Sequence, residues 1–246
     1  MKTGKNAKNN LHIAAIKAAF PQTLPVMAGY LFLGMPYGVL MVTRGFSALY
    51  PLLTSVFIFA GSMEFALANL LIGAFSPLEA IFLALMINSR HIFYGISMLD
   101  KYRGLGAKKI YLIFAMSDET FSLNYSVNAP SDVDRGWFMF YISLLDHLYW
   151  ILGASLGGIF GTLLRLDIVG IDFAMTAMFV VILIEQILAS KKNILSVIIG
   201  LSVSALALII FGAVDFLIPS MAGMLLLLSA LNKPIGKLIG NGGDEI

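Results

Sequence analysis

Five short polar clusters interrupt apolar stretches of this sequence and carry side chains that could do chemistry. They are Gly61-Ser62-Met63-Glu64, Asn88-Ser89-Arg90-His91, Ser117-Asp118-Glu119-Thr120, Asp146-His147 and Glu185-Gln186. An arginine in the middle of a membrane-spanning run costs about 2.5–3.5 kcal/mol on insertion scales, so such residues are kept where they face a protein interior or a watery cavity. So many ionisable groups at depth favour a protein that moves a solute over one that is only an anchor.

The cluster around Arg90 offers three kinds of hydrogen-bond donor. The guanidinium of Arg90 can bind a carboxylate with two parallel bonds, Asn88 can satisfy unwound backbone, and His91 can shuttle protons near neutral pH. The structural alternative is that Arg90 neutralises a buried carboxylate, such as Glu64 or Asp118, and only holds helices together. Both roles can coexist in one residue.

The cluster that ends at Glu64 predicts a broken helix. Gly61 and Ser62 loosen a helix and expose backbone groups, which is tolerable at membrane depth only against a cavity. The freed N–H and C=O groups could then meet a substrate carboxylate and ammonium, and Glu64 could bind the ammonium or carry a proton. The alternative is a small-residue packing site in which Glu64 pairs with an arginine.

Two further clusters carry adjacent ionisable residues. Asp118 and Glu119 point about 100° apart on a helix, so we expect one to face a cavity and the other a structural partner. Asp146-His147 precedes Tyr149 and Trp150. Because such aromatics mark membrane interfaces, we expect this pair to be solvated near the headgroups, with a role in the site as the alternative. For Glu185-Gln186, snorkelling at the membrane edge and a cavity role remain equal alternatives.

The composition is that of an integral membrane protein. Of 246 residues, 59% are hydrophobic and 12% are charged, against about 45–50% and about 25% in soluble domains. Long unbroken apolar runs predict an all-α, polytopic fold. The net charge of +2 gives no indication of nucleic-acid binding, and the lack of cysteine excludes disulfides and thiolate sites. Three scattered histidines and the absence of a nucleophile or metal motif predict no enzyme, cofactor or metal site.

We read the chain as one transmembrane permease domain, residues 1–246. It has a polar and amphipathic N-terminal segment (1–21), with a short helix over 11–20 that ends before Pro21, a first half (22–127) and a second half (136–231). About eight hydrophobic segments are predicted, at residues 23–43, 49–75, 78–99, 110–127, 137–163, 173–189, 194–211 and 216–231.

Charge bias predicts the topology, because basic loops stay on the cytoplasmic side. If all eight segments crossed fully, the basic loop at 101–109 would lie opposite the basic N-terminus. If the second and sixth segments are broken or re-entrant, the N-terminus and the basic residues at 101–109, 191–192 and 233–237 all lie on the cytoplasmic side. The acidic loop at 128–135 then lies outside. Gly34-x-x-x-Gly38 and Gly157-x-x-x-Gly161 match an inverted repeat, although such spacing is also common in helix interfaces.

Four stretches together resemble the AzlC-type branched-chain amino-acid permeases: residues 59–65, 88–95, 117–121 and 170–179. The likeness covers about residues 20–230. It implies a bacterial inner-membrane exporter of branched-chain amino acids with a small hydrophobic AzlD-type partner subunit.

The polar clusters by themselves indicate a polar path through a helical bundle. The resemblance implies an exporter of branched-chain (neutral, apolar) amino acids, and we expect it to work by alternating access, with proton coupling as the obvious energy source. Its apolar cargo would sit among Phe57, Phe59 and Phe93. A passive channel and an accessory subunit without transport of its own are the alternatives. The residues expected to bind substrate or to couple transport are Gly61, Ser62, Glu64, Asn88, Arg90, His91, Asp118 and Glu119.

Overall fold

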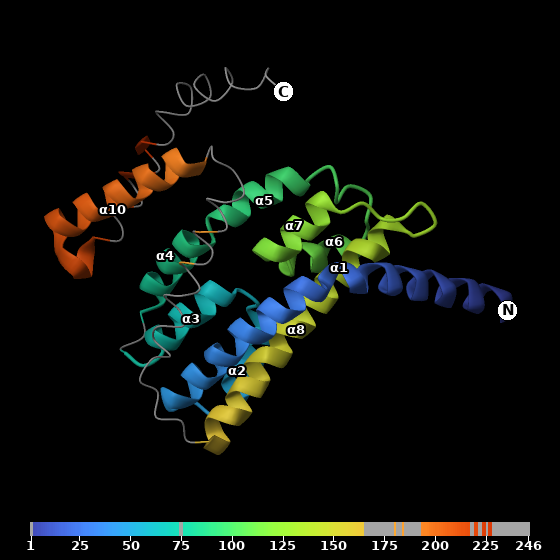
Figure 1. The fold of residues 1–246 in the computed structure, drawn as a ribbon, viewed down its shortest axis with the longest axis horizontal. Coiled ribbons are helices and arrows are strands. Elements are labelled where there is room, and N and C mark those ends of the chain that lie inside the picture. The colour runs from blue at the N-terminus through green and yellow to red at the C-terminus, as the bar shows by residue number, and fades with distance from the viewer. Residues whose placement is uncertain are drawn as a thin grey trace. The chain divides into compact units, whose positions relative to one another are not determined.

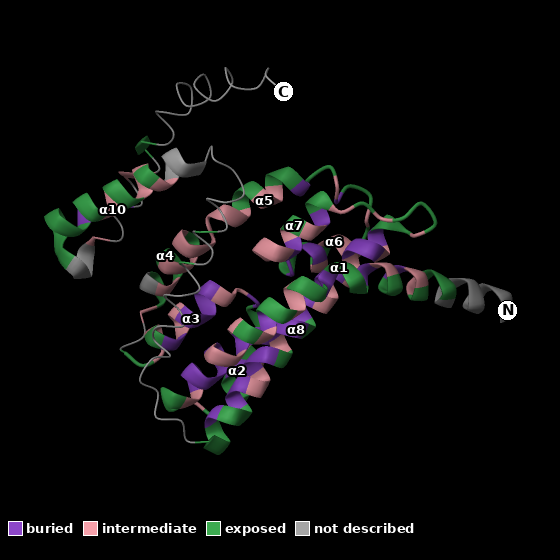
Figure 2. Cartoon of the chain, in the orientation of Figure 1, coloured by how far each residue is buried: buried purple, intermediate pink, exposed green. Residues whose placement is uncertain are grey.

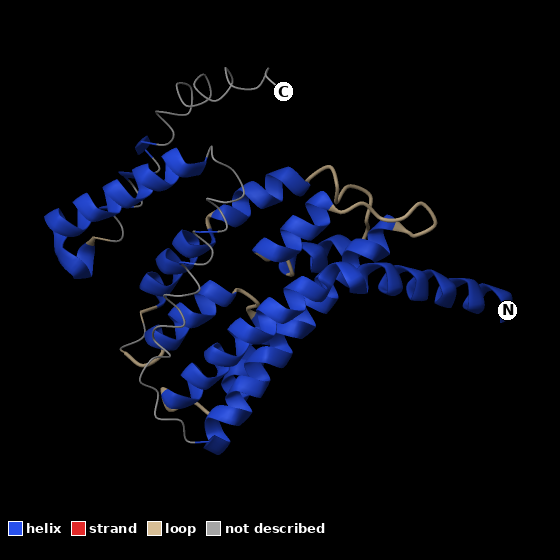
Figure 3. Cartoon of the chain, viewed as in Figure 1, coloured by secondary structure: helices blue, strands red, loops and turns tan. Residues whose placement is uncertain are grey.

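A computed structural model of the chain describes residues 2–73, 76–164, 180, 184, 193–216, 219–220, 223–224 and 226–227. The chain divides into two compact units, Met1–Met175 and Thr176–Ile246. Within the described ranges all regular structure is helical (Figure 3), which confirms the predicted all-α class. The predicted single permease domain, with its two halves, remains a prediction.

The first unit is built on two long helices, α1 (Lys2–Thr43) and α8 (Arg135–Leu164), which lie side by side (Figure 1). The expected break at Pro21 is wrong, because α1 is one helix that contains Pro21, Pro25 and Pro36. Proline removes a backbone donor, but membrane helices tolerate it where neighbouring helices and side chains support the backbone. Here α8 packs along α1, and Thr23, between the first two prolines, donates to the Phe20 carbonyl at 3.0 Å.

Glycines allow the two long helices to touch through their backbones. A Cβ atom added at Gly38 would lie 2.0 Å from the Ala154 carbonyl oxygen, and one at Gly157 would lie 2.1 Å from that of Met35. The two glycine patterns that suggested a repeat therefore face each other across one helix contact. The helix-interface alternative accounts for them, and the inverted repeat has no support from these positions.

Three successive apolar segments of this unit are divided into pairs of shorter helices. The pairs are α2 (Leu49–Phe57) with α3 (Gly61–Leu70), α4 (Pro77–Asn88) with α5 (Arg90–Met98), and α6 (Lys108–Phe114) with α7 (Asp118–Ser126). The first division lies in the segment expected to be broken, and Phe59 takes a positive φ of 46° there. The division of residues 110–127 was not expected from the sequence.

By length and composition, two described helical stretches could cross a membrane, Asn10–Thr43 and Arg135–Leu164. Ala80–Asn88 with Arg90–Met98 is a third candidate if that pair, bent by 51°, counts as one broken span. The described residues thus support a helical membrane protein, while the count of eight segments remains a prediction.

Buried side chains of the first unit gather on α8 and the helices around it (Figure 2). One apolar cluster joins α1, α5, α6 and α8 beside the loop at 99–107. Its buried members are Ala19, Met98, Tyr102, Leu112, Met116, Phe138, Met139 and Ile142. Large apolar side chains elsewhere are exposed, among them Phe32, Ile110 and Leu163, as expected of a surface that meets lipid.

The second unit is described mainly through α10 (Asn193–Asp215), in which Gly212 leaves helical geometry with a φ of 75°. Most of the predicted sixth segment, including Glu185-Gln186 and the motif at 170–179, lies outside the described residues. The predicted break in that segment is therefore a prediction still.

Candidate functional site

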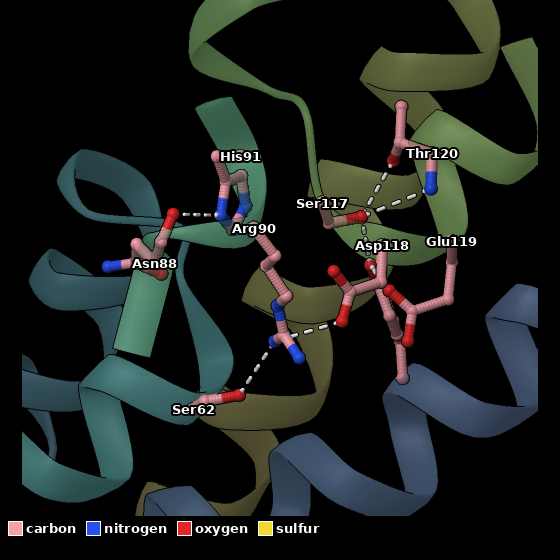
Figure 4. A network of polar contacts seen from close by, with 9 residues as sticks. Ser62, Asn88, Arg90, His91, Ser117, Asp118, Glu119 and Thr120 are labelled. Atoms are coloured by element: carbon pink, nitrogen blue, oxygen red, sulfur yellow. Dashed lines mark hydrogen bonds and ion pairs between the residues drawn. The ribbon is translucent and has the colours of Figure 1, made fainter. Parts of the chain in front are cut away.

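An ion pair between Arg90 and Asp118 lies where the broken segments come together (Figure 4). Arg90 Nη2 is 2.9 Å from Asp118 Oδ2 and donates to Ser62 Oγ at 3.3 Å. These contacts join α3, α5 and α7. Of the two carboxylates offered by the sequence as partners for Arg90, the structure selects Asp118.

Each residue of this trio stands in the first turn of a short helix, because the breaks in the segments create new helix ends. Gly61 opens α3, Arg90 opens α5 and Asp118 opens α7. Ser117 caps α7 by accepting from the Thr120 N–H at 3.1 Å. A carboxylate in a first turn is favoured by the helix dipole and by the unpaired N–H groups there. The clusters are thus helix starts rather than insertions in mid-helix.

Glu64 occupies the start of α3 and is fully buried. Its Oε1 accepts from the Ala60 N–H at 3.0 Å and from the Trp150 indole at 2.9 Å. Gly61 makes room for that indole, since a Cβ atom there would lie 2.9 Å from the ring. The suggested pairing of Glu64 with an arginine is wrong, because the indole of α8 and the chain's own backbone hold this carboxyl group.

Asn88 and His91 lie at the bend between α4 and α5. His91 Nδ1 is 3.1 Å from the main-chain oxygen of Asn88, and the His91 ring packs on Tyr94. Both residues therefore adjoin Arg90, while their shared contact is local to the bend (Figure 4). The hydrogen bond and ring contact given for these residues stay within the bend, so neither residue joins the contacts of the ion pair.

Glu119 points to a different partner from Asp118, as expected for adjacent helical residues. It accepts from the Tyr30 hydroxyl of α1 at 2.7 Å. The same hydroxyl lies 2.5 Å from Ser117 Oγ, which is 3.0 Å from Thr120 Oγ1. Thr120 in turn donates to Asp146 Oδ2 at 2.8 Å. Glu119 and Asp146 are thus joined by three hydroxyl groups.

The expected solvation of Asp146-His147 is wrong. Asp146 has no exposed surface and His147 is 7% exposed, because α8 is packed by α1, α2, α6 and α7. The two nitrogens of the His147 ring lie 3.0 Å from the Tyr111 hydroxyl and 3.0 Å from the Ser55 carbonyl. Trp150, expected near an interface, is buried as well.

The sequence carried a signal for this buried pair. Ser143, Asp146, His147 and Trp150 follow the spacing i, i+3, i+4, i+7, which places them on one helix face. Each of these four residues makes a hydrogen bond to a neighbouring helix, and together they contact α2, α3, α6 and α7. The hydroxyl of Tyr30 carried no comparable signal, because it lies in another segment and outside the five polar clusters, whereas Thr120 belongs to one of them.

The three phenylalanines expected to hold an apolar side chain do not share one environment. Phe59 is buried, with its ring 4.3 Å from that of His147, whereas Phe57 and Phe93 are 71% and 65% exposed. In the part of the chain that the structure describes, no three His, Asp or Glu side chains converge as a metal site would require.

Comparisons with known proteins find a family match and several relatives. Residues 25–164 match the model of the family described as AzlC protein. A Bacillus subtilis protein named branched-chain amino acid transport protein AzlC is 56% identical over 91% of this chain and 88% of its own length. An uncharacterized membrane protein of Haemophilus influenzae is 46% identical, with 92% of each chain covered.

A more distant relative is inner membrane protein YgaZ of Escherichia coli, 26% identical over 70% of this chain and 71% of its own length. No solved structure matches the chain. The family match runs from residue 25, within α1, to the end of α8, and it includes the Arg90–Asp118 pair, Glu64 and the chain of hydroxyls. On this evidence the chain is a membrane protein that belongs to the AzlC family.

Proposed function

We propose that this protein is a carrier that exports branched-chain, neutral amino acids across the bacterial inner membrane. The observation that carries the proposal is the Ser62–Arg90–Asp118 trio at the meeting of three helix starts. Within the described residues, Arg90 Nε and Asp118 Oδ1 are buried without a hydrogen-bond partner. A cation with a spare donor beside an anion with a spare acceptor matches the carboxylate and ammonium of an amino acid.

The partial burial of this pair fits a binding role. The side chains of Arg90 and Asp118 are 28% and 27% exposed. A buried pair gains strength only when further hydrogen bonds satisfy its remaining atoms. A zwitterion that donated to Asp118 and accepted from Arg90 would supply those bonds. The name of the B. subtilis relative supports branched-chain amino acids as the cargo.

Export needs a source of energy, and a proton is the ion that buried carboxyl groups can carry. Alternating access would expose the trio to each side in turn, with rearrangement at the breaks between the short helices. Family membership supports the further proposal of a small hydrophobic AzlD-type partner subunit. The basic N-terminus supports its cytoplasmic location, and the name of the E. coli relative supports the inner membrane.

The test is counterflow in vesicles that contain the purified protein, with and without the co-expressed partner. Labelled leucine, isoleucine or valine should accumulate transiently against unlabelled amino acid inside, and glutamate should not replace them. Asp118→Asn should abolish counterflow. Asp100→Asn, which changes an exposed carboxylate paired with exposed Arg103, is the matched control and should behave as the natural protein does.

The other functional classes are outcomes of the same measurement. Flux that does not saturate and shows no counterflow would indicate a channel. Activity that requires another subunit and survives Asp118→Asn would indicate an accessory role. Either result would overturn the proposal that this chain carries the cargo.

A further inference from the structure

The hydrogen-bond chain between Glu119 and Asp146 contains more oxygen–oxygen contacts than its hydroxyl groups have hydrogens. Four oxygen–oxygen contacts of 2.7, 2.5, 3.0 and 2.8 Å link Glu119, Tyr30, Ser117, Thr120 and Asp146 in that order. Three hydroxyl groups supply three hydrogens, and a hydroxyl hydrogen rotates to whichever neighbour accepts. With both carboxyl groups ionised, one contact would bring two oxygens together without a hydrogen between them.

Adding one proton satisfies the whole chain. If Asp146 is protonated, it donates to Thr120, Thr120 to Ser117, Ser117 to Tyr30, and Tyr30 to ionised Glu119. If Glu119 is protonated, every donor reverses. In the exchange four O–H bonds break and four form, and the net result is one proton moved between the two carboxyl groups. Ser117 can still accept from the Thr120 N–H in both arrangements.

The surroundings of these carboxyl groups favour a bound proton. No described lysine or arginine forms an ion pair with Glu119 or Asp146. Arg90 is paired with Asp118. Asp146 is fully buried, and its Oδ1 has no hydrogen-bond partner among the described residues. Two negative charges joined only by hydroxyl groups, one of them fully buried, would carry a large desolvation cost. Nearby ionisable groups on the packed helices are Tyr30, Glu64, Arg90, Tyr111, Asp118 and His147.

We propose that Glu119 and Asp146 form a single proton-binding site, in which one proton is shared through the hydroxyls of Tyr30, Ser117 and Thr120. Asp146 is the buried end of the site, and Glu119 is the end beside the Arg90–Asp118 pair. The role of this site in driving export rests on the proposed function, whereas the site itself does not. A substrate ammonium that reached Asp118 would lie next to Glu119 and would drive the proton toward Asp146.

Infrared spectroscopy of the purified full-length protein tests the shared proton. At neutral pH the natural protein should show the carbonyl stretch of a protonated carboxylic acid. Asn or Gln in place of either acid can donate an N–H and so supplies the missing hydrogen itself. Glu119→Gln alone and Asp146→Asn alone should therefore each abolish the same band, because the remaining carboxyl group becomes ionised. Asp100→Asn is the control and should leave the band unchanged.

Loss of the band in only one of the two variants would place the proton on one residue and overturn the sharing. Loss in neither, or no acid band in the natural protein, would overturn the site altogether. The measurement on the natural protein stands even if a variant fails to fold, and it needs no transport.

A second measurement tests the link to transport. Thr120→Val removes the hydroxyl but keeps the shape, so counterflow should persist while accumulation driven by a pH gradient is lost. Thr162→Val, which removes an exposed hydroxyl from α8, should keep both. Counterflow together with a failed infrared test would reject the proton site and leave the carrier. Confirmed bands without counterflow would reject the carrier and leave the proton site. Full pH-driven accumulation in Thr120→Val would reject proton movement through the Thr120 hydroxyl.

Discussion

At the scale of single residues, the site depends on charges that are only partly compensated. Arg90 uses one nitrogen for both Asp118 and Ser62, so its planar fork is not fully engaged. Such an arrangement is weak as a structural clamp, because a buried ion pair repays its desolvation only when the geometry is complete. The same incompleteness leaves hydrogen-bonding capacity for a ligand.

Arg90→Lys should lower substrate affinity while the protein still folds. Lysine keeps the charge but lacks the fork that binds a carboxylate with two bonds. A lost charge-assisted hydrogen bond is worth about 1.5–3 kcal/mol, so the dissociation constant should rise roughly 10- to 100-fold. Equilibrium binding of labelled leucine measures it. Arg103→Lys, in an exposed pair, is the control, and an equal affinity in the two variants would remove Arg90 from the binding site.

Glu64→Gln should leave membrane insertion intact but weaken transport at neutral pH. The amide retains an oxygen for the Trp150 indole, but it gives up the negative charge at the start of α3. The pH profile of flux in vesicles separates a structural from a proton-carrying role. A profile that matches that of the natural protein would exclude proton transfer by Glu64. Asp134→Asn is the control, because Asp134 is an exposed residue just before α8 and asparagine keeps an oxygen for the Trp137 N–H.

At the scale of elements, short helices bring the chemistry together and long helices hold the frame. Gly157 and Gly38 allow the backbones of α1 and α8 to touch, and α2, α3, α6 and α7 pack around this pair. The break at Gly61 was predictable, because glycine and serine precede a buried acid. The break at residues 115–117 was not predictable, because Ala115 and Met116 are compatible with a continuous helix. Only the structure shows that Ser117 caps the start of a new helix.

Gly157→Ala should destabilise the protein by about 1–3 kcal/mol, the usual range for overpacking a tight contact. The added methyl group would clash with the Met35 carbonyl and push the two long helices apart. Gly29→Ala, on an open face of α1, is the matched control and should be neutral or slightly stabilising. Thermal unfolding in detergent compares the two, and equal melting temperatures would contradict the close contact.

At the scale of the whole molecule, the sequence predicted the all-α membrane class and the family, and it named the three residues that meet in the Ser62–Arg90–Asp118 trio. The pairing of Arg90 with an acid was among its alternatives, while the burial of Asp146 was missed, because nearby Tyr149 and Trp150 resemble an interfacial belt. Tyr30 could not be assigned, since it is brought to Glu119 only by the packing of α1 against distant segments. Topology depends on crossings that helix length alone does not define.

Single cysteines in this cysteine-free chain can test the predicted topology. If the second segment is re-entrant, Ser47→Cys, Ser76→Cys and Ser131→Cys should all react with a membrane-impermeant thiol reagent from outside. Ala107→Cys, in the basic loop, should react only from the cytoplasmic side. Labelling of positions 47 and 76 from opposite sides would remove the re-entrant segment.

The ion pair between α5 and α7 also bears on how the chain is made. Arg90 and Asp118 belong to different hydrophobic segments, and Arg90 leaves the ribosome first. Until its counter-ion follows, the insertion machinery meets an arginine that costs about 2.5–3.5 kcal/mol at mid-bilayer. Nascent chains that end before Asp118 should therefore remain open to added protease, and longer ones should become protected. On this account the pairing of Arg90 with Asp118 also commits two hydrophobic segments to the lipid together.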